Sequence, residues 1–406
     1  MNMGIRIRLS VMMFLQFFIW GAWFVTLGTY LGSINFSGTQ IGWVYTTTGW
    51  AAIISPLFVG MIADRFFPGE KVLAAMHFLG AILMYLASTQ TSFIPFFVLL
   101  LAYTMCYMPT LALVNAVSFS QMSDVEKQFG GIRVFGTLGW IVAGIIISRM
   151  GVESSVTPMY LAAGLSVLMG IYSLFFLPST PPKGAGKQVN VSDLLGLEAI
   201  TLMKRPAFAV FTISSLLICI PLAFYYTFTN PFLNEIGMEK AAEKMTMGQM
   251  SEVGFMLIMP FLLVRLGVKW MLIIGMLAWV ARYVLFAYGN VDSAVWMLYG
   301  GILLHGICYD FFFMTGHIYV DEAAPREIRA SAQGFIALVT YGIGMLIGNF
   351  VCGPIVDMFS KTESDGTVLH NWNQIWLVPA AMAFAVTVVF ALTFWDKRKP
   401  NVESAA

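Results

Sequence analysis

The chain has 406 residues, of which 59% are hydrophobic and only 11% are charged, and its mean hydropathy is +0.80. A soluble domain normally carries about a quarter charged residues, so most of this surface must face something other than water. The formal net charge of +1 argues against nucleic acid as a partner, because neutralising phosphates requires a basic face.

The apolar segments predict an all-α integral membrane protein with twelve transmembrane helices. A bilayer core needs roughly 20 apolar residues per helix. The segment after Arg6 and Arg8 stays apolar beyond the length of a signal sequence and lacks a small-residue cleavage site, so it is predicted as the first span. In chain order the predicted spans cover residues 9–32, 40–63, 72–90, 93–119, 131–150, 157–177, 207–234, 247–265, 270–289, 294–319, 329–357 and 374–395.

A polar stretch over roughly 178–206, opening PSTPPKGAGK, separates the first six spans from the last six. Proline, glycine and lysine together neither continue a helix nor enter lipid. The sequence therefore predicts an N-terminal six-helix bundle over 1–178, a cytoplasmic linker over 179–206, a C-terminal six-helix bundle over 207–396 and a cytoplasmic tail over 397–406. This arrangement favours a substrate site between the halves near mid-membrane.

Lysine and arginine placement predicts the orientation. With the N-terminus inside, most basic residues fall in cytoplasmic segments, and the opposite side holds only Arg149, Lys240, Lys244 and Lys361. Both termini are therefore predicted to be cytoplasmic, in a multi-pass protein of the cytoplasmic (inner) membrane.

Three other features of the chain are predicted to be structural. Asp64 and Arg65, after span two, are predicted to clamp a loop, and the polar segment 361–373 is predicted as a solvated loop rather than a lid. The cysteines lie in apolar segments without a CxxC spacing, which favours packing over a disulfide or a metal site. They are Cys106, Cys219, Cys308 and Cys352.

Two carboxylates fall inside predicted spans. Glu252 lies in span eight with Gln249 one turn earlier, and Asp310 lies deep in span ten among aromatic residues. An intramembrane carboxylate is costly and usually faces a cavity and acts. The alternative is a structural role, in which each carboxylate pairs with an arginine or a helix end.

Helical spacing places several polar and aromatic side chains on common faces. Arg133, Thr137 and Trp140 follow at i, i+4 and i+7, and His305 and Tyr309 at i and i+4. An aromatic ring beside hydrogen-bonding groups suits a ligand with a flat part and several hydroxyls. The alternatives are that Arg133 snorkels at a helix end and that the histidine and the aromatic residues only pack.

The chain resembles the nucleoside/proton symporters of the major facilitator superfamily over nearly its whole length. The matching strings, in order, are FLQFFIWGAWFVTLGTYL, AYTMCYMPTLALVNAVSF, IRVFGTLGW, GQMSE, YDFF and IRASAQG. The resemblance implies the two-bundle fold of that superfamily and proton-coupled nucleoside uptake by alternating access.

Position by position, the resemblance implies a nucleoside site and a proton-coupling residue. It assigns Asp310 to proton coupling and expects Glu252 mainly to bind substrate, with a second possible role in coupling. The substrate contacts that it implies are Arg133, Thr137, Trp140, Gln249, Glu252 and Tyr309.

The sequence departs from the family pattern at three positions. His305 stands where a tyrosine is expected. Span seven reads PLAFYYTFTNPFL, which places Ala223 and Tyr226 near the positions of a glutamine and an asparagine. His305 and Tyr226 are therefore included among the expected substrate contacts, and the preferred nucleosides stay open.

Three other functions are weighed. A carrier for another small polar solute, such as a sugar or a nucleobase, fits the same fold. A membrane-embedded enzyme is disfavoured because the sequence shows no HExxH, GxSxG or phosphate-binding glycine loop, and no carboxylate-rich metal cluster. A sensor is disfavoured because no signalling domain is appended. No cofactor or metal is expected. The expected partners are a nucleoside, protons and the lipid bilayer. The protein is expected to act as a monomer, and sodium coupling stays open.

Overall fold

The computed structural model describes residues 2–65, 67–181, 197–364 and 368–395, without the side chains of 56–65 and 126. Apart from two short strands, its regular structure is helical, as the sequence predicts. Within this part, 10 helical segments are long and apolar enough to cross a membrane. The tail 397–406, residues 182–196 of the predicted linker, and the side chains of Asp64 and Arg65 lie outside the described residues.

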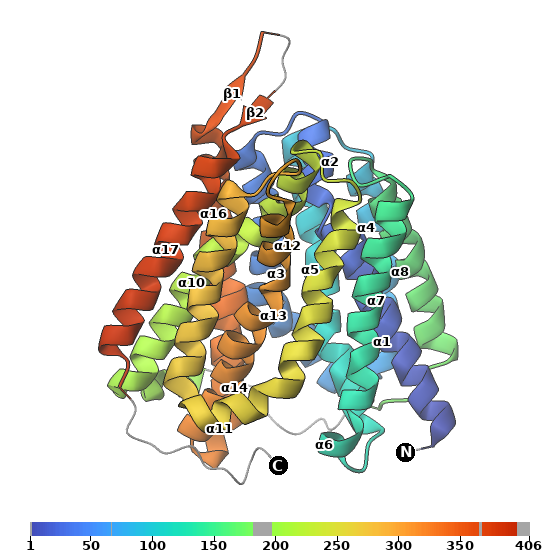
Figure 1. The fold of residues 1–406 in the computed structure, drawn as a ribbon. Helices are drawn as coiled ribbons and strands as arrows, with labels where there is room; N and C mark the ends of the chain where they lie inside the picture. The colour runs from blue at the N-terminus through green and yellow to red at the C-terminus, as the bar shows by residue number, and fades with distance from the viewer. Residues whose placement is uncertain (1, 66, 182–196, 365–367, 396–406) are drawn as a thin grey trace. The chain divides into compact units, whose positions relative to one another are not determined.

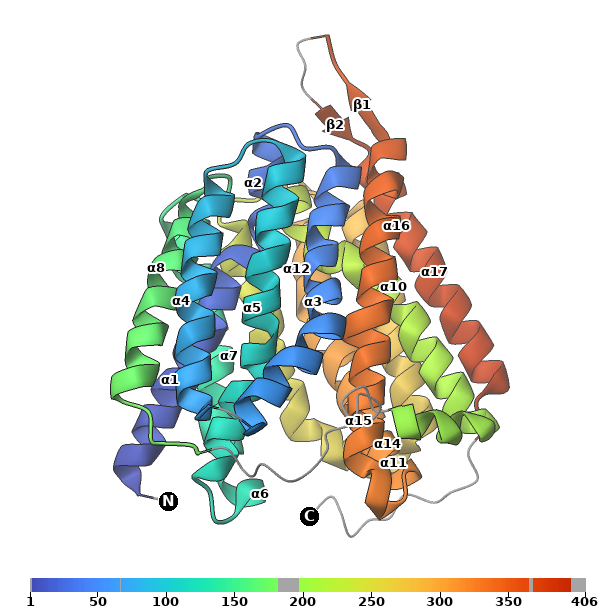
Figure 2. The ribbon, with the colours of Figure 1, turned by 180° about the vertical axis from the view of Figure 1, so that it is seen from behind.

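The chain divides into two compact units, of which the first comprises Met1–Phe36 and Trp43–Asn190. Its helix α4 packs between α5 and α8, and α1 packs along α7 (Figure 2). The elements of this unit are α1 (Met3–Phe24), α2 (Leu27–Ser33), α3 (Gly38–Arg65) from Trp43 onward, α4 (Gly69–Ser88), α5 (Phe93–Ser120), α6 (Val125–Gln128), α7 (Gly130–Arg149) and α8 (Thr157–Phe175).

A buried polar network joins α1, α4 and α5 inside the first unit. The Gln16 side chain donates from Nε2 to the Thr110 hydroxyl at 2.7 Å, and its Oε1 accepts from His77 Nε2 at 2.9 Å. The Thr110 hydroxyl donates to the Tyr107 carbonyl at 2.5 Å, and the Tyr107 hydroxyl donates to the Gln16 carbonyl. These side chains are at most 2% exposed, so the network satisfies polar groups that lipid or apolar core would leave without partners.

The second unit comprises Ser37–Gly42 and Val191–Ala406. Its helix α17 packs against α10 and α11 (Figure 1). The elements of this unit are η1 (a 3₁₀ helix, Leu197–Lys204), α10 (Pro206–Glu235), α11 (Ala241–Tyr288), α12 (Val295–Leu303), α13 (His305–Cys308), η2 (a π-helical turn, Tyr309–Met314), α14 (Thr315–Ala323), η3 (3₁₀, Arg326–Ile328), α15 (Arg329–Ala337), η4 (π-helical, Leu338–Gly344), α16 (Met345–Met358), β1 (Ser360–Thr362), β2 (Val368–His370) and α17 (Trp372–Thr393).

Helix α11 contains both the eighth and the ninth predicted span. Its backbone leaves the helical conformation only at Gly267, where φ is +72° and ψ is 167°. Glycine adopts this left-handed region at little cost, whereas a residue with a Cβ does not. Gly267 therefore breaks the element between the spans predicted over 247–265 and 270–289.

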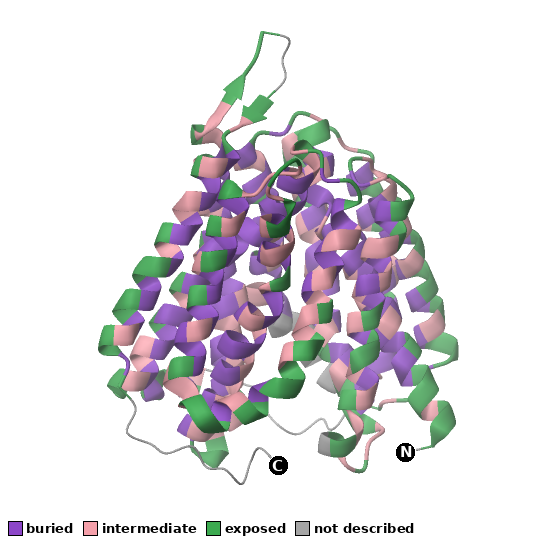
Figure 3. Cartoon of the chain, viewed as in Figure 1, coloured by how far each residue is buried: buried purple, intermediate pink, exposed green. Residues whose placement is uncertain are grey.

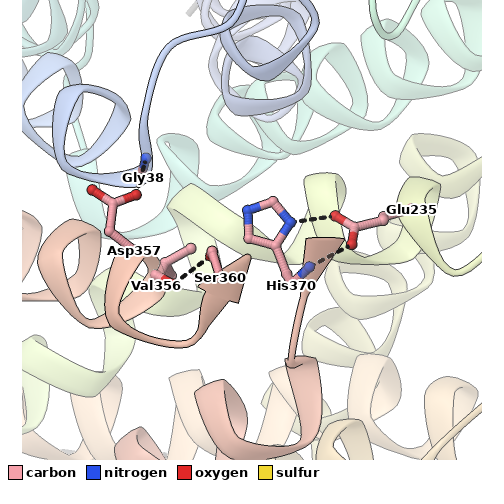
Figure 4. A network of polar contacts seen from close by, with 6 residues as sticks. All are labelled: Gly38, Glu235, Val356, Asp357, Ser360 and His370. Carbon is pink, nitrogen blue, oxygen red and sulfur yellow. Dashed lines mark hydrogen bonds and ion pairs between the residues drawn. The ribbon is translucent and has the colours of Figure 1, made fainter. Parts of the chain in front are cut away.

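The segment 361–373, predicted as a solvated loop, is mostly exposed in its described residues, and part of it forms a short hairpin. Strands β1 and β2 pair antiparallel, with Ser360 opposite His370. His370 contacts Glu235 at the end of α10 through its backbone N–H at 3.2 Å and its ring Nδ1 at 2.6 Å (Figure 4). This double contact fixes the hairpin to the end of α10.

A second polar contact in the same region holds the start of α3. Both oxygens of Asp357, on α16, accept backbone N–H groups. One accepts from Gly38 at 2.6 Å (Figure 4), and the other accepts from Thr39 at 2.8 Å. The first N–H groups of a helix lack partners within the helix and carry partial positive charge. Asp357 therefore caps α3 from a residue far along the chain.

Many large hydrophobic side chains are exposed. Figure 3 marks the exposed residues in green along the helices. Leu392, Leu257 and Phe175 are 80%, 79% and 75% exposed. Exposing such apolar side chains costs little free energy when they face the hydrocarbon core of a bilayer rather than water. By contrast, the four cysteines are buried and free.

Candidate functional site

The first unit presents Arg133, Thr137 and Trp140 on one face of α7, and all three are half-buried. The Arg133 guanidinium lies 4.2 Å from the centre of the Phe17 ring on α1. Trp140 meets Trp20, also on α1, edge-to-face at 5.5 Å. The predicted stripe thus exists, and α1 supplies aromatic rings that hold its two ends.

Close contacts between α11 and α13 position the polar groups of the second unit. A Cβ at Gly306 would lie 2.6 Å from the backbone carbon of Ser251, and one at Gly248 would lie 3.0 Å from the Cβ of His305. The Ser251 hydroxyl donates to the Leu303 carbonyl at 2.8 Å and accepts from the Gly306 N–H at 3.1 Å. These glycines allow the two backbones to approach, as small residues do in membrane helices.

Gln249 and Glu252 lie on this part of α11, and both are half-buried. Glu252 is close enough to Tyr225, Tyr226 and Asp310 to interact electrostatically with each of them. The carboxylate predicted to bind substrate and the one predicted to carry the proton therefore belong to one electrostatic cluster.

Three predicted residues gather in an aromatic stack that also includes Tyr225. The His305 ring stacks on Tyr225 at 5.2 Å and 22°, and on Tyr309 at 6.2 Å and 29°. Tyr226 meets the His305 ring edge-to-face at 6.4 Å. The stack combines residues of α10, α13 and η2, so the i, i+4 spacing of His305 and Tyr309 does place them on one face.

Asp310 lies in the π-helical turn η2 and is 0% exposed. Its two carboxyl oxygens have no hydrogen-bond partner among the residues that the structure describes. Turns of this type occur frequently at functional sites because they interrupt the regular backbone ladder. A buried carboxyl without donors favours its neutral, protonated form over the charged one.

Arg282, on the second half of α11, is a further charged group beside the aromatic stack. It is 0% exposed, and its Nε donates to the Gly301 carbonyl at 3.0 Å. Its Nη1 and Nη2 have no hydrogen-bond partner within the described ranges. The guanidinium lies 4.0 Å from the centre of the Tyr225 ring, at the end of the aromatic stack.

The two departures in span seven differ in their surroundings. Ala223 is 0% exposed, and a Cβ added at Gly348 on α16 would lie 2.7 Å from the Cβ of Ala223. A larger side chain at Ala223 would therefore collide with α16. Tyr226 is half-buried and reaches the aromatic stack, so it is the departure that lies beside the predicted contacts.

Sequence reasoning missed two aromatic residues that the fold brings to this cluster. Tyr225 lies between Arg282 and His305, and Tyr341, in η4, places its hydroxyl 3.4 Å from that of Tyr309. The adjacent tyrosines in the string FYYT were a signal for the first. No pattern marked Tyr341, because a π-helical turn has no sequence signature.

Known proteins resemble this chain over nearly its whole length. "Putative nucleoside transporter YegT" of Escherichia coli (strain K12) is 45% identical over 95% of this chain and 93% of the relative. Xanthosine permease of the same organism is 36% identical over 98% of both chains. A crystal structure of the nucleoside transporter NupG matches with a TM-score of 0.90 and 32% identity, covering 96% of this chain and 100% of that one.

These likenesses agree with the two-bundle membrane fold that the sequence predicts, and they describe transporters rather than enzymes. The model of the nucleoside H⁺ symporter family matches residues 3–399. The chain is therefore a multi-pass membrane transporter that belongs to the nucleoside H⁺ symporter family.

Proposed function

We propose that this transporter takes up nucleosides together with protons, with Asp310 carrying the coupled proton and Glu252 and Gln249 binding the nucleoside. The observation that carries the assignment is the burial of Asp310 without a hydrogen-bond donor in the described part of the chain. An ionised carboxylate there is costly, so the side chain gains most from taking up a proton.

The neighbouring carboxylate gives a reason for coupling. Two negative charges within electrostatic reach repel each other, so protonation of Asp310 relieves the repulsion from Glu252. A nucleoside that hydrogen-bonds an ionised Glu252 then binds best while Asp310 is neutral. This difference in affinity between the two protonation states is what coupled transport requires.

The remaining contacts divide by chemistry. Tyr226, His305 and Tyr309 offer ring faces and edges to a nucleobase, whereas Gln249 and Glu252 offer groups for ribose hydroxyls. In the first unit we assign Trp140 to stacking, and Arg133 and Thr137 to hydrogen bonding.

We also propose that the protein acts as a monomer in the cytoplasmic (inner) membrane, with both termini in the cytoplasm. The distribution of lysine and arginine supports the orientation. Accessibility of tags at each end to protease, in sealed cells and in inverted vesicles, tests it.

The function is tested by uptake of radiolabelled uridine and adenosine into proteoliposomes, with and without an inward proton gradient. We expect accumulation above equilibrium that a protonophore abolishes. Uptake that follows a sodium gradient instead would reject proton coupling, and no uptake into sealed vesicles would reject nucleosides as substrates.

The assignment of Asp310 is tested with Asp310→Asn. This variant should lose accumulation above equilibrium but keep exchange of labelled for unlabelled nucleoside, because it mimics the protonated carboxyl. The matched control is Asp292→Asn, the same change at an exposed turn outside the candidate site. If Asp310→Asn still accumulates nucleoside as the control does, Asp310 does not carry the proton.

A further inference from the structure

A fully buried guanidinium is among the most expensive groups a protein can contain. Arg282 is 0% exposed, and of its donors only Nε has a hydrogen-bond acceptor within the described residues. Desolvating a cation costs several kcal/mol unless other groups compensate for it. The ring face of Tyr225 at 4.0 Å supplies part of that compensation.

Arg282 is in contact with one member of the aromatic stack. Its guanidinium lies over the Tyr225 ring, Tyr225 stacks on His305 at 5.2 Å, and His305 stacks on Tyr309 at 6.2 Å. The Nε–H bond to Gly301 fixes the guanidinium to α12. A Cβ at Gly301 would collide with the Phe286 ring, so that carbonyl has little freedom to move away.

We propose that Arg282 is a specificity-determining residue that selects nucleosides by the charge of their base. Nucleosides with neutral or anionic bases bind at the stack, and nucleosides with cationic bases are excluded. This inference rests on the proposed function, because it takes His305 and Tyr309 as the rings that receive the base. A fixed positive charge behind the stack repels a cationic ring and attracts an anionic one in a medium that screens weakly.

Two other charged groups lie near the stack. Glu252 interacts electrostatically with Tyr225 and Tyr226, carries a negative charge and is assigned to the ribose hydroxyls. Asp310 is protonated in the loaded state under the proposed function and then carries no charge. Arg282 is the charged group in direct contact with the stack, over the ring of Tyr225, so we expect its sign to dominate at the base.

The test is competition against bound radiolabelled inosine on the purified full-length protein, at one neutral pH and without a gradient. Two ligand pairs differ in charge. 1-Methyladenosine is cationic, and N6-methyladenosine is neutral and has the same number of each heavy atom. Xanthosine has an acidic base that is anionic where inosine is neutral.

In the unmodified protein, 1-methyladenosine should compete about tenfold or more weakly than N6-methyladenosine, the size expected of unit charges several ångströms apart in protein. Arg282→Gln should reduce the affinity ratio of N6-methyladenosine to 1-methyladenosine about tenfold, and should lower the affinity for xanthosine relative to inosine by a similar factor. Arg282→Lys, which keeps the charge and loses the planar guanidinium, should leave both affinity ratios unchanged. Tyr225→Phe, which keeps the ring, should also leave both affinity ratios unchanged.

Three outcomes would overturn the inference. Equal weakening of all four ligands by Arg282→Gln would make Arg282 a packing residue only. Failure of the unmodified protein to distinguish the charged from the neutral ligands would reject the inference even if Arg282→Gln does not fold. A preference of the unmodified protein for the cationic base would assign the controlling charge to Glu252. If the protein binds none of the nucleosides, the proposed function itself fails, a result distinct from unchanged ratios.

Discussion

Two buried polar clusters, one in each unit, differ in how their hydrogen bonds are satisfied. In the first unit, Gln16 bonds both His77 and Thr110. In the second, Asp310 and the terminal nitrogens of Arg282 have no partner in the described part of the chain. A satisfied network stabilises a unique packing, whereas unpartnered buried groups cost stability and need another reason to be present. The difference indicates that the first cluster stabilises helix packing, and it supports the proposal that the second cluster takes up a proton and contacts substrate.

The largest effect is expected in the second cluster. Glu252→Gln should raise the KM for nucleoside uptake by roughly tenfold to a hundredfold, because hydrogen bonds to a charged group contribute about 1.5–3 kcal/mol. The melting temperature of the purified protein should stay close to that of the unmodified chain. Glu239→Gln, at an exposed position, is the control. An unchanged KM would remove Glu252 from the binding site.

Gln16→Leu should show the opposite pattern. It leaves His77 Nε2 without its acceptor and removes the donor to the Thr110 hydroxyl, and an unsatisfied buried polar group costs about 1–3 kcal/mol. We expect a clearly lower melting temperature and an unchanged KM for the molecules that remain folded. Gln374→Leu, on an exposed turn of α17, should change neither. A raised KM with normal stability would mean that the first cluster also binds substrate.

A smaller effect on stability is expected from Asp357→Ala, which removes the cap of α3. Losing a side-chain cap costs about 1 kcal/mol. Hydrogen exchange at the Gly38 and Thr39 amides, both bonded to Asp357, should speed up while exchange in the middle of α10 does not. In Asp357→Asn, which keeps an oxygen acceptor, the exchange rate of these amides should lie between those of the unmodified protein and Asp357→Ala. Equal exchange in all three proteins would show that the cap contributes nothing.

The smallest effect is expected from His370→Ala at the hairpin. The contact with Glu235 is partly exposed, and such pairs contribute about 0–1 kcal/mol. We expect a slight loss of stability and normal uptake. A large change in uptake would instead make the β1–β2 hairpin part of the transport mechanism and place a third functional region beside the two compared above.

Composition and span length were enough to predict the helices, because lipid forces nearly every backbone group into a helix. The ends were less accurate. The first span was predicted from residue 9, but α1 begins at Met3, where the Asn2 side chain accepts the Gly4 N–H at 2.9 Å. A cap of this kind lets a helix extend into the polar region beyond the apolar run.

The candidate site was predicted only in part, for a physical reason. The i, i+4 pattern located His305 and Tyr309 on one face because both lie on the same stretch of chain. It could not place Arg282 against Tyr225, since that contact depends on how α11 packs on α10. Nor could it predict the π-helical turns η2 and η4, which follow from packing rather than from residue type.

The burial of the cysteines has a practical consequence for labelling. Cys106 is 8% exposed, and Cys219, Cys308 and Cys352 are at most 1% exposed. Membrane-impermeant thiol reagents should therefore leave the unmodified chain unlabelled, since a thiol must be reached by water to react. The unmodified chain can then serve as an unreactive background without removal of its native cysteines. A single new thiol, such as Thr137→Cys, would report from which side of the membrane reagents reach that position.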